Sequence, residues 1–191
     1  MTEILDYGLD TPARAMLVLV LSMKDRKKQK AMNKLHYQKI IFYYEKLKQL
    51  KEIFFSNFKY GGVSYELAEN MESLEESGLV TKIGYKYLLT DKGEKLADEL
   101  KLSSTYDKDA LCKLEYSKEL LNDLPDKELL FFMYSTFPET QTHSIEYNQL
   151  VKNKKKLTCN LFLKGRINSA TAAEWIGINQ RKFLEMLPKC D

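Results

Sequence analysis

The chain of 191 residues contains only three cysteines and two histidines, and this shortage excludes several kinds of site. Cys112, Cys159 and Cys190 are widely separated, and no pair of them has the spacing of metal ligands. We therefore expect free thiols, as in a protein of the reducing cytoplasm. The sequence also lacks a glycine-rich phosphate loop and a nucleophile-elbow motif. Catalytic residues, a metal and a cofactor are all unexpected, so the protein is not predicted to be an enzyme.

Long hydrophobic runs are missing as well. The longest run, Ala15 to Leu21, is far too short to span a bilayer. Its basic residues follow it, whereas those of a signal peptide precede the apolar segment. We therefore expect a cytoplasmic protein that does not contact a membrane.

Acidic residues become scarce towards the C-terminus. The whole chain has a net charge of +3, but residues 152–191 hold nine lysines and arginines against three acidic residues. Such a local excess of positive charge is typical of a surface that binds a polyanion. The alternative is an ordinary set of solvated surface lysines.

The segment from Gly165 to Leu187 has the spacing of a helix-turn-helix. If Ser169 is its first position, Ala173 is the fifth, where two crossing helices require a small residue, and Gly177 is the ninth, where the turn favours a left-handed backbone. The apolar positions recur at helical spacing and should pack inward together. These positions are Ala172, Ile176, Ile178, Phe183 and Met186. The alternative is a simple helical hairpin.

The exposed side chains at the start of the second of these helices suit a recognition helix. Amides and guanidinium groups can read base edges, while lysines can contact phosphates. The predicted base-reading residues are Asn179, Gln180 and Arg181, and the predicted phosphate contacts are Lys182, Arg166, Lys164, Lys154, Lys155 and Lys156. The segment therefore predicts binding to double-stranded DNA.

The N-terminal half begins with two expected helices. A buried helix over 13–23 leads into the basic connection from Lys24 to Lys30, which could touch phosphates or be a solvated loop. The next helix is expected over 33–54, with Lys39, Glu45 and Lys46 facing water. Its apolar seam consists of His36, Ile40, Tyr43, Leu47, Leu50 and Phe54. A seam of this length indicates burial in the domain core or across a homodimer.

A capped helix and a hairpin follow. A turn at Tyr60–Val63 precedes a helix from Ser64 to Ser77, which Gly78 terminates. Residues 79–90 predict a two-stranded hairpin with a turn at Gly84. Asp91 to Glu94 resemble a capping box for a helix that reaches Leu102.

The order of these elements resembles a winged helix. The segments that carry the resemblance are Lys34–Phe42, Tyr60–Leu67, Leu74–Val80 and Leu88–Gly93, with a further segment around 128–139. They are similar to the YwgA-type family of winged-helix proteins, and residues 161–187 are similar to the C-terminal half of small antitoxin-like proteins. The resemblance implies a mainly α fold with a small β-hairpin wing, in which Lys82 and Lys86 would be phosphate contacts.

One helix departs from the pattern of a DNA-reading winged helix. The helix after Ser64 carries five glutamates (Glu66, Glu69, Glu72, Glu75 and Glu76) and no lysine or arginine. Phosphates would repel these carboxylates, so this helix should not read a DNA groove. The alternative function is therefore a protein-interaction module, antitoxin-like or adaptor, that presents the acidic helix to a basic protein partner.

The predicted organisation has three parts. Residues 1–102 form a winged-helix domain, residues 103–126 a linker and connecting helix, and residues 127–191 a helical domain that ends in the helix-turn-helix. Within the last part, helices are expected over 127–134, 144–152 and 157–164. The leading prediction is a homodimeric, sequence-specific DNA-binding protein that regulates transcription.

Overall fold

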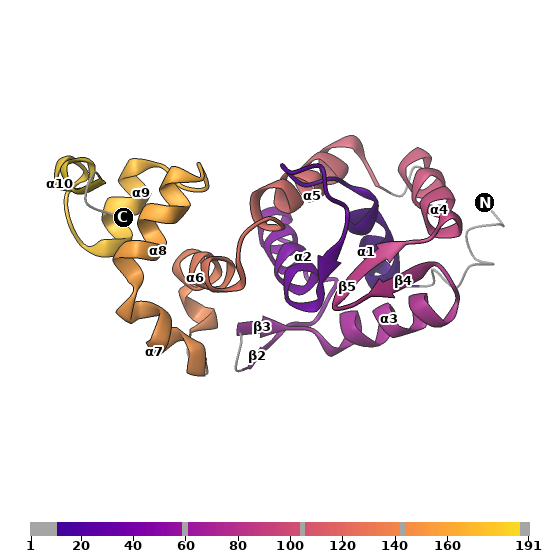
Figure 1. Cartoon of the computed structure of the whole chain (residues 1–191). Coiled ribbons are helices and arrows are strands. Elements are labelled where there is room, and N and C mark those ends of the chain that lie inside the picture. Colours follow the sequence, from indigo (N-terminus) through magenta and orange to yellow (C-terminus); the bar gives the residue numbers. More distant parts are fainter. Residues whose placement is uncertain (1–10, 59–60, 104–105, 142–143, 188–191) are drawn as a thin grey trace. The chain divides into compact units, whose positions relative to one another are not determined.

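The computed structural model describes residues 11–58, 61–103, 106–141 and 144–187. It is mainly helical, with a small three-stranded antiparallel sheet (Figure 1). Contacts along the chain divide it into two compact units, Met1–Ser56 with Gly62–Asp123 and Asn57–Gly61 with Leu124–Asp191. We describe the two units separately.

The first unit surrounds its sheet with helices. Its helices are α1 (Pro12–Ser22), α2 (Lys34–Lys48), α3 (Tyr65–Glu76), α4 (Asp91–Leu102) and α5 (Lys108–Leu121). Its sheet contains β1 (Met32–Asn33), β4 (Val80–Ile83) and β5 (Lys86–Leu89) in the antiparallel order β1-β5-β4. A second pair of strands, β2 (Ser56–Phe58) and β3 (Gly61–Val63), forms where the sequence predicted only a turn, and its residues Asn57, Phe58 and Gly61 are assigned to the second unit.

Helix α1 is the centre of this unit. The Thr11 side chain accepts a hydrogen bond from the Arg14 amide, and Pro12 occupies the first turn, where its missing amide proton is tolerated. Because nearly every residue of α1 is apolar, the helix can be buried on all sides. It contacts α3, α4 and β5, and Leu17, Val18 and Leu19 have no exposed surface.

Helix α2 is shorter than the sequence predicted. It ends at Lys48, where Gln49 adopts a left-handed backbone with φ of 55°, instead of continuing to Phe54. The predicted seam therefore stops being helical before Leu50, and Phe54 is 78% exposed. The seam residues up to Tyr43 are buried within this unit, so they do not require a dimer. Association of two copies through α2 stays a prediction.

Two charged residues of α2 lie inside the unit, which corrects the prediction that they face water. Lys39 is 1% exposed and its Nζ donates to the Gly62 carbonyl at 2.8 Å. Glu45 is also buried, and its Oε2 accepts from the Glu52 amide at 3.2 Å. Both groups bind backbone atoms of the segment that follows α2. A helical wheel of α2 alone cannot reveal such contacts. Lys46 is exposed, as predicted.

The capped helix and the hairpin agree with the prediction. Ser64 caps α3 by accepting from the Leu67 amide, and Gly78 follows the helix with φ of 71°. Strands β4 and β5 pair with Val80 opposite Leu89, and Gly84 has φ of 61° in the connecting turn. Glycine tolerates both of these left-handed positions without a steric penalty.

The N-cap of helix α4 lies one residue before the first residue of the predicted capping box. Its N-cap is Thr90, whose hydroxyl accepts from the Gly93 amide at 3.2 Å; Asp91 is the first helical residue. The Thr90 amide also donates to the Leu79 carbonyl, so the start of α4 lies against the start of the hairpin. A Cβ on Gly93 would overlap this carbonyl oxygen and press on the Leu89 side chain. Gly93 is therefore required by packing, although its backbone is helical.

We predict that Gly93→Ala destabilises the first unit by about 2 kcal/mol, because the new methyl group meets backbone that cannot move aside. The sign of the change in unfolding free energy is informative, because replacing glycine by alanine in an open helix stabilises that helix by roughly 1 kcal/mol. Gly78→Ala is the control: nothing lies within 4 Å of its Cβ, and only the left-handed backbone opposes it. Urea unfolding followed by circular dichroism should show the larger loss for Gly93→Ala; equal losses would contradict the steric explanation.

The boundary of the first unit lies beyond the predicted one. Helix α5 packs against α2, and Lys48 of α2 pairs with Asp109 of α5 at 2.8 Å. Residues 106–123 therefore belong to the first unit, whereas the sequence suggested a separate connecting helix in 103–126. The face of α5 with Leu114 and Leu121 is buried in this contact region.

The second unit is built from helices, apart from the strand residues Asn57, Phe58 and Gly61. They are α6 (Asp126–Thr136), a short 3-10 helix (Pro138–Thr140), α7 (Ile145–Lys152), α8 (Lys154–Leu163), α9 (Ser169–Ile176) and α10 (Gln180–Met186). Residues 129–134 of α6 are buried. The helix begins at Asp126, directly after Pro125 and one residue before the predicted start at 127.

Two further expectations change in this unit. Helix α8 starts at Lys154, so the three lysines 154–156 form its first turn and are not a loop before a helix at 157. Cys159 is buried and disulfide-bonded, which corrects the expectation of a free thiol. Cys112 is free and exposed, and Cys190 lies outside the described residues. Cytoplasmic location therefore stays a prediction, and the cysteines no longer support it as a set of free thiols.

Across the described part of the chain, the helices are too short or too polar to cross a lipid bilayer.

Candidate nucleic-acid interface

Helices α8, α9 and α10 share one hydrophobic cluster. Its buried members are Cys159, Ala172, Ala173, Ile176 and Phe183, and Ile178 and Met186 pack against it. The Phe162 and Phe183 rings meet edge to face with centroids 5.2 Å apart. The five apolar positions that the sequence assigned to the interior are thus brought together. Ala173, the predicted small residue, is 3% exposed.

The turn between α9 and α10 has the predicted backbone. Gly177 ends α9 in a left-handed conformation with φ of 77°, and its amide donates to the Ala173 and Glu174 carbonyls. The Ile178 amide closes the turn on the Ala173 carbonyl at 3.0 Å. The side chain of Asn168 caps α9 by accepting from the Thr171 amide. Local hydrogen bonds therefore hold the two helices in one arrangement.

Helix α9 is also fixed from its other side. The ring of Trp175, the only tryptophan of the chain, meets Phe131 and Phe132 of α6 edge to face, with centroids 5.8 Å and 6.0 Å away. Such aromatic pairs each contribute roughly 1 kcal/mol beyond their buried area. No local pattern in the sequence indicates this role of Trp175, because its partners lie more than 40 residues away. The pair of helices α9 and α10 is thus packed against α6 through Trp175.

The predicted reading residues lie on the surface at the start of α10. Asn179, Gln180, Arg181 and Lys182 are all exposed, and the Arg181 side chain is 89% exposed. Arg181 Nε donates to Glu185 Oε1 at 2.9 Å, one turn along the helix. A surface pair of this kind is worth only about 0.5 kcal/mol, so Arg181 can exchange it for another acceptor.

The two amide side chains are partly engaged. Asn179 Oδ1 accepts from the Lys182 amide and caps α10, which leaves its Nδ2 group available as a donor. Gln180 Nε2 donates to the Ser169 hydroxyl at 2.7 Å and joins the starts of the two helices. The cap also means that the α10 N-terminus is not an open set of donors for phosphate. The surface chemistry at this turn therefore depends mainly on Arg181 and Lys182.

Two of the predicted phosphate contacts, Arg166 and Lys164, are engaged inside the second unit. Arg166 is 8% exposed, so burial makes it a poor phosphate contact. Lys164 pairs with Glu128 of α6 at 2.6 Å, and Asn160 donates to the same carboxylate. Glu128 is 32 residues from its nearest partner, and no sequence spacing indicates this link. Lys164 is half-exposed and anchors α8 to α6.

The other predicted phosphate contacts remain on the surface. Lys155 and Lys156 are exposed and Lys154 is half-buried in the first turn of α8, which contains no acidic residue. Cations at a helix N-terminus are disfavoured by the helix dipole, so this turn carries uncompensated positive charge. A polyanion close to it would offset that charge.

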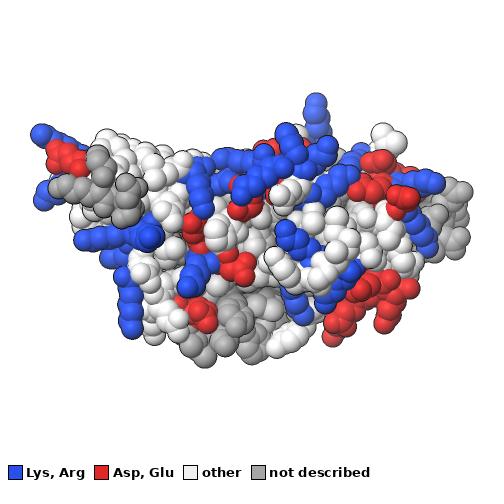
Figure 2. All heavy atoms as spheres, in the orientation of Figure 1, with Lys and Arg blue, Asp and Glu red and all other residues white. Residues whose placement is uncertain are grey.

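The hairpin lysines belong to the first unit and are assessed there alone. Lys82 is exposed and its Nζ lies 5.2 Å from the centre of the Tyr87 ring, while Lys86 is half-buried. Helix α3 of the same unit presents its glutamates to solvent; Glu69, Glu72, Glu75 and Glu76 are exposed. Figure 2 shows Asp and Glu gathered at the lower right, over α3. The glutamates that the sequence places on α3 therefore form an exposed acidic surface.

The described residues contain no group of three or more potential metal ligands. Comparison with protein-family models, with curated sequences and with solved structures finds no match to this chain.

Proposed function

We propose that the protein binds double-stranded DNA in a sequence-specific manner through a helix-turn-helix formed by α9 and α10, and that it regulates transcription. The observation that supports this most directly is the exposed Arg181 and Lys182 at the start of a short helix fixed by the buried Phe183. A helix in that position can lay its first residues against base edges in the major groove.

The energies favour Arg181 as the main reader. Its pair with Glu185 is worth about 0.5 kcal/mol, whereas a bidentate contact of arginine with guanine discriminates by roughly 1–3 kcal/mol. Exchange of one for the other is therefore favourable at the correct base. Lys155 and Lys156 would contribute affinity for any sequence, because phosphates are the same everywhere.

For the first unit we propose a winged helix, as the resemblance implies. The support is the order of the elements, α1-β1-α2-β2-β3-α3-β4-β5, together with the sheet order β1-β5-β4. Helix α3 would be the groove-reading helix of such a domain, but its exposed glutamates oppose that role. We therefore assign DNA reading to α10, with Lys82 and Lys86 as phosphate contacts of the hairpin.

We expect Arg181→Ala to relax sequence preference, whereas the triple change of Lys154, Lys155 and Lys156 to alanine should weaken all DNA equally. The lysine variant should also lower the slope of log affinity against log salt by about 0.9 for each phosphate that its lysines no longer neutralise. Selection of bound fragments from a random duplex library, followed by binding at several salt concentrations, measures both effects.

The matched control for this experiment is Glu69→Gln with Glu72→Gln in α3. Removing two carboxylates should leave DNA binding unchanged or slightly stronger, since the only effect is less repulsion. If Arg181→Ala is silent and the glutamine pair abolishes sequence preference, α3 is the reader and our assignment is wrong.

The second candidate is an interaction module for a basic protein partner, and the exposed glutamates of α3 favour it. Here Glu69→Gln with Glu72→Gln should release the partner, while Arg181→Ala should not. Affinity capture with each variant separates this function from DNA binding.

A further inference from the structure

A basic cleft of about 510 Å³ lies in the first unit, separate from the proposed DNA-reading helix. Its walls are the end of α1, the loop that follows it, the end of α4 and one side of α5 from Lys108 to Glu119. Five lysines line it: Lys24, Lys28, Lys30, Lys101 and Lys108. In Figure 2 lysine and arginine side chains gather at the upper edge of the face, over α5 of this unit.

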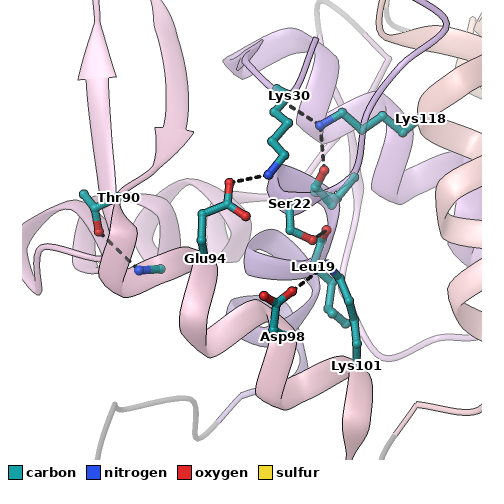
Figure 3. A network of polar contacts seen from close by, with 10 residues as sticks. Leu19, Ser22, Lys30, Thr90, Glu94, Asp98, Lys101 and Lys118 are labelled. Atoms are coloured by element: carbon teal, nitrogen blue, oxygen red, sulfur yellow. Dashed lines mark hydrogen bonds and ion pairs between the residues drawn. The ribbon is translucent and has the colours of Figure 1, made fainter. Parts of the chain in front are cut away.

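Three of these lysines have no compensating carboxylate. Lys30 pairs with Glu94 at 2.7 Å and Lys101 with Asp98 at 3.2 Å (Figure 3). By contrast, Lys24, Lys28 and Lys108 are exposed and form no ion pair with any described residue.

Two carboxylates also line the cleft, Glu115 and Glu119 of α5. Glu94 and Asp98 already neutralise Lys30 and Lys101, so the remaining three lysines stand against these two glutamates and an excess of one positive charge is left to attract an anion.

The loop that carries Lys24, Lys28 and Lys30 is built around one buried carboxylate. Asp25 is 1% exposed, and its Oδ1 accepts from the Lys27 and Gln29 amides at 2.8 Å and 2.9 Å. Asn122, which follows α5, donates to Asp25 Oδ2 at 2.8 Å and to the Ala31 carbonyl at 3.3 Å. The basic run is therefore an ordered turn, and not the freely solvated loop that its composition allows.

A buried lysine of α5 binds the same loop through hydrogen bonds to backbone carbonyls. Lys118 of α5 has no exposed surface, and its Nζ donates to the Val20 carbonyl at 2.7 Å and to the Lys30 carbonyl at 2.6 Å (Figure 3). The end of α1 and the end of the loop are thus tied to α5. The walls of the cleft are positioned before any ligand arrives, which reduces the ordering entropy that binding must overcome.

Lys28 adopts a backbone conformation that a lysine rarely takes. Its φ is 60°, in the left-handed region that costs a residue other than glycine about 1 kcal/mol. The Lys28 amide donates to the Asp25 carbonyl at 2.9 Å, so the turn around Asp25 maintains this conformation. A glycine would satisfy the backbone at lower energy, whereas a lysine also supplies an ammonium group at the cleft.

We propose that this cleft is a binding site for a small organic anion that carries at least two phosphate groups. Ligand sites of small molecules enclose about 300–1000 Å³, so the volume is suitable. The cleft offers lysines, and a lysine ammonium binds phosphate as a compact point charge with three donors. The cleft also contains the free thiol of Cys112, which makes occupancy measurable.

The test uses inorganic pyrophosphate as the probe and the full-length protein. Bound pyrophosphate should slow alkylation of Cys112 by iodoacetamide, read by mass spectrometry of the peptide that contains Cys112. Calorimetry should give a dissociation constant that rises with salt. The variant with Lys24, Lys28 and Lys108 all changed to glutamine should bind at least about 10-fold more weakly, since 1.4 kcal/mol corresponds to a factor of 10.

The control variant changes Lys34, Lys95 and Lys127 to glutamine. These exposed lysines lie outside the cleft and remove the same total charge, so pyrophosphate affinity should change by less than about 2-fold through screened long-range effects. Unfolding by urea confirms that both variants fold. The glutamines of the cleft variant are exposed, so its stability should match that of the wild type.

Three outcomes would overturn the proposal. The first is an equal loss of affinity in the cleft and control variants, and the second is no protection of Cys112 at any pyrophosphate concentration. The third is protection of Cys112 by a short DNA duplex but not by pyrophosphate, which would make the cleft a DNA-backbone surface. None of these outcomes depends on Arg181, so failure of this site is distinguishable from failure of the proposed DNA-reading helix.

Discussion

Phe183→Ala is expected to lower the unfolding free energy of the second unit by about 3–5 kcal/mol and to abolish DNA binding. Phe183 has no exposed surface and lies in the cluster that α8, α9 and α10 share. Removing its ring reduces the buried apolar area and leaves a cavity whose walls have no packing partner. A loss of this size is a large part of the roughly 5–15 kcal/mol that stabilises a typical domain.

The measurement is urea unfolding followed by the fluorescence of Trp175. As the single tryptophan of the chain, it reports on α9 and its packing against α6. Leu184→Ala is the matched control, since its side chain is the next in the sequence and is 46% exposed. It should cost less than about 1 kcal/mol. Similar losses for the two variants would show that Phe183 is not the centre of this cluster.

The second large effect is a rise in the stability of the first unit between about pH 7.5 and 9.5. Burial lowers the pKa of Lys118 to about 7, although Asp25 and Glu94 oppose this shift and Lys30 adds to it. Burial also lowers the pKa of Lys39 to about 7. In the unfolded chain both lysines have a pKa of about 10.4.

The sign of this pH dependence follows from proton binding. Between the two pKa values the unfolded chain holds a proton on each lysine that the folded protein releases, so raising the pH favours the folded state. Each lysine should contribute roughly 1 kcal/mol for each pH unit in this window. The contribution is fully present above the unfolded pKa and is lost as the pH falls through the folded pKa.

Tyrosines set the upper limit of the window. Burial raises the pKa of Tyr43 and Tyr106 to about 12, so above about pH 10 the unfolded chain ionises where the folded protein does not. Stability should then fall again.

Lys118→Met tests the lysine contribution, because methionine fills similar space without a charge. The variant should show a shallower rise with pH than the wild type, whereas Lys113→Met, at a half-exposed position of the same helix, should not change the slope. Circular dichroism in urea at several pH values measures both slopes. A wild-type stability that is flat from about pH 7.5 to 9.5 would show that Lys118 and Lys39 stay charged in the folded protein.

Most helices and both β4 and β5 could be predicted from local patterns, since caps, glycines and apolar spacing act over a few residues. The Ser64 cap, the left-handed Gly78 and the turn at Gly177 are examples, and the structure confirms all three. The end of α2 could not be predicted, because apolar residues continue at helical spacing past Gln49. There Gln49 has a left-handed backbone and the Glu45 carboxylate accepts a hydrogen bond from the Glu52 amide, features that apolar spacing does not indicate.

The exposed part of the candidate interface could be predicted for the same reason. Gln180, Arg181 and Lys182 begin a helix whose apolar face is evident, so their exposure follows from periodicity. Arg166 and Lys164 were misjudged as free surface cations, because burial and the Glu128 carboxylate come from residues far away in the chain. Charge alone does not indicate which lysine or arginine a distant element will cover.

By itself, the sequence determined the helix pair with its turn, the acidic surface of α3 and the hairpin, since each depends on interactions between residues close together in the chain. Only the tertiary structure decided which charges are buried and which converge. Lys39 and Lys118 bind backbone carbonyls inside the first unit, and the uncompensated Lys24, Lys28 and Lys108 meet at one cleft. The physical reason is that desolvation and electrostatic attraction depend on distance in space, and packing brings together residues up to 98 positions apart.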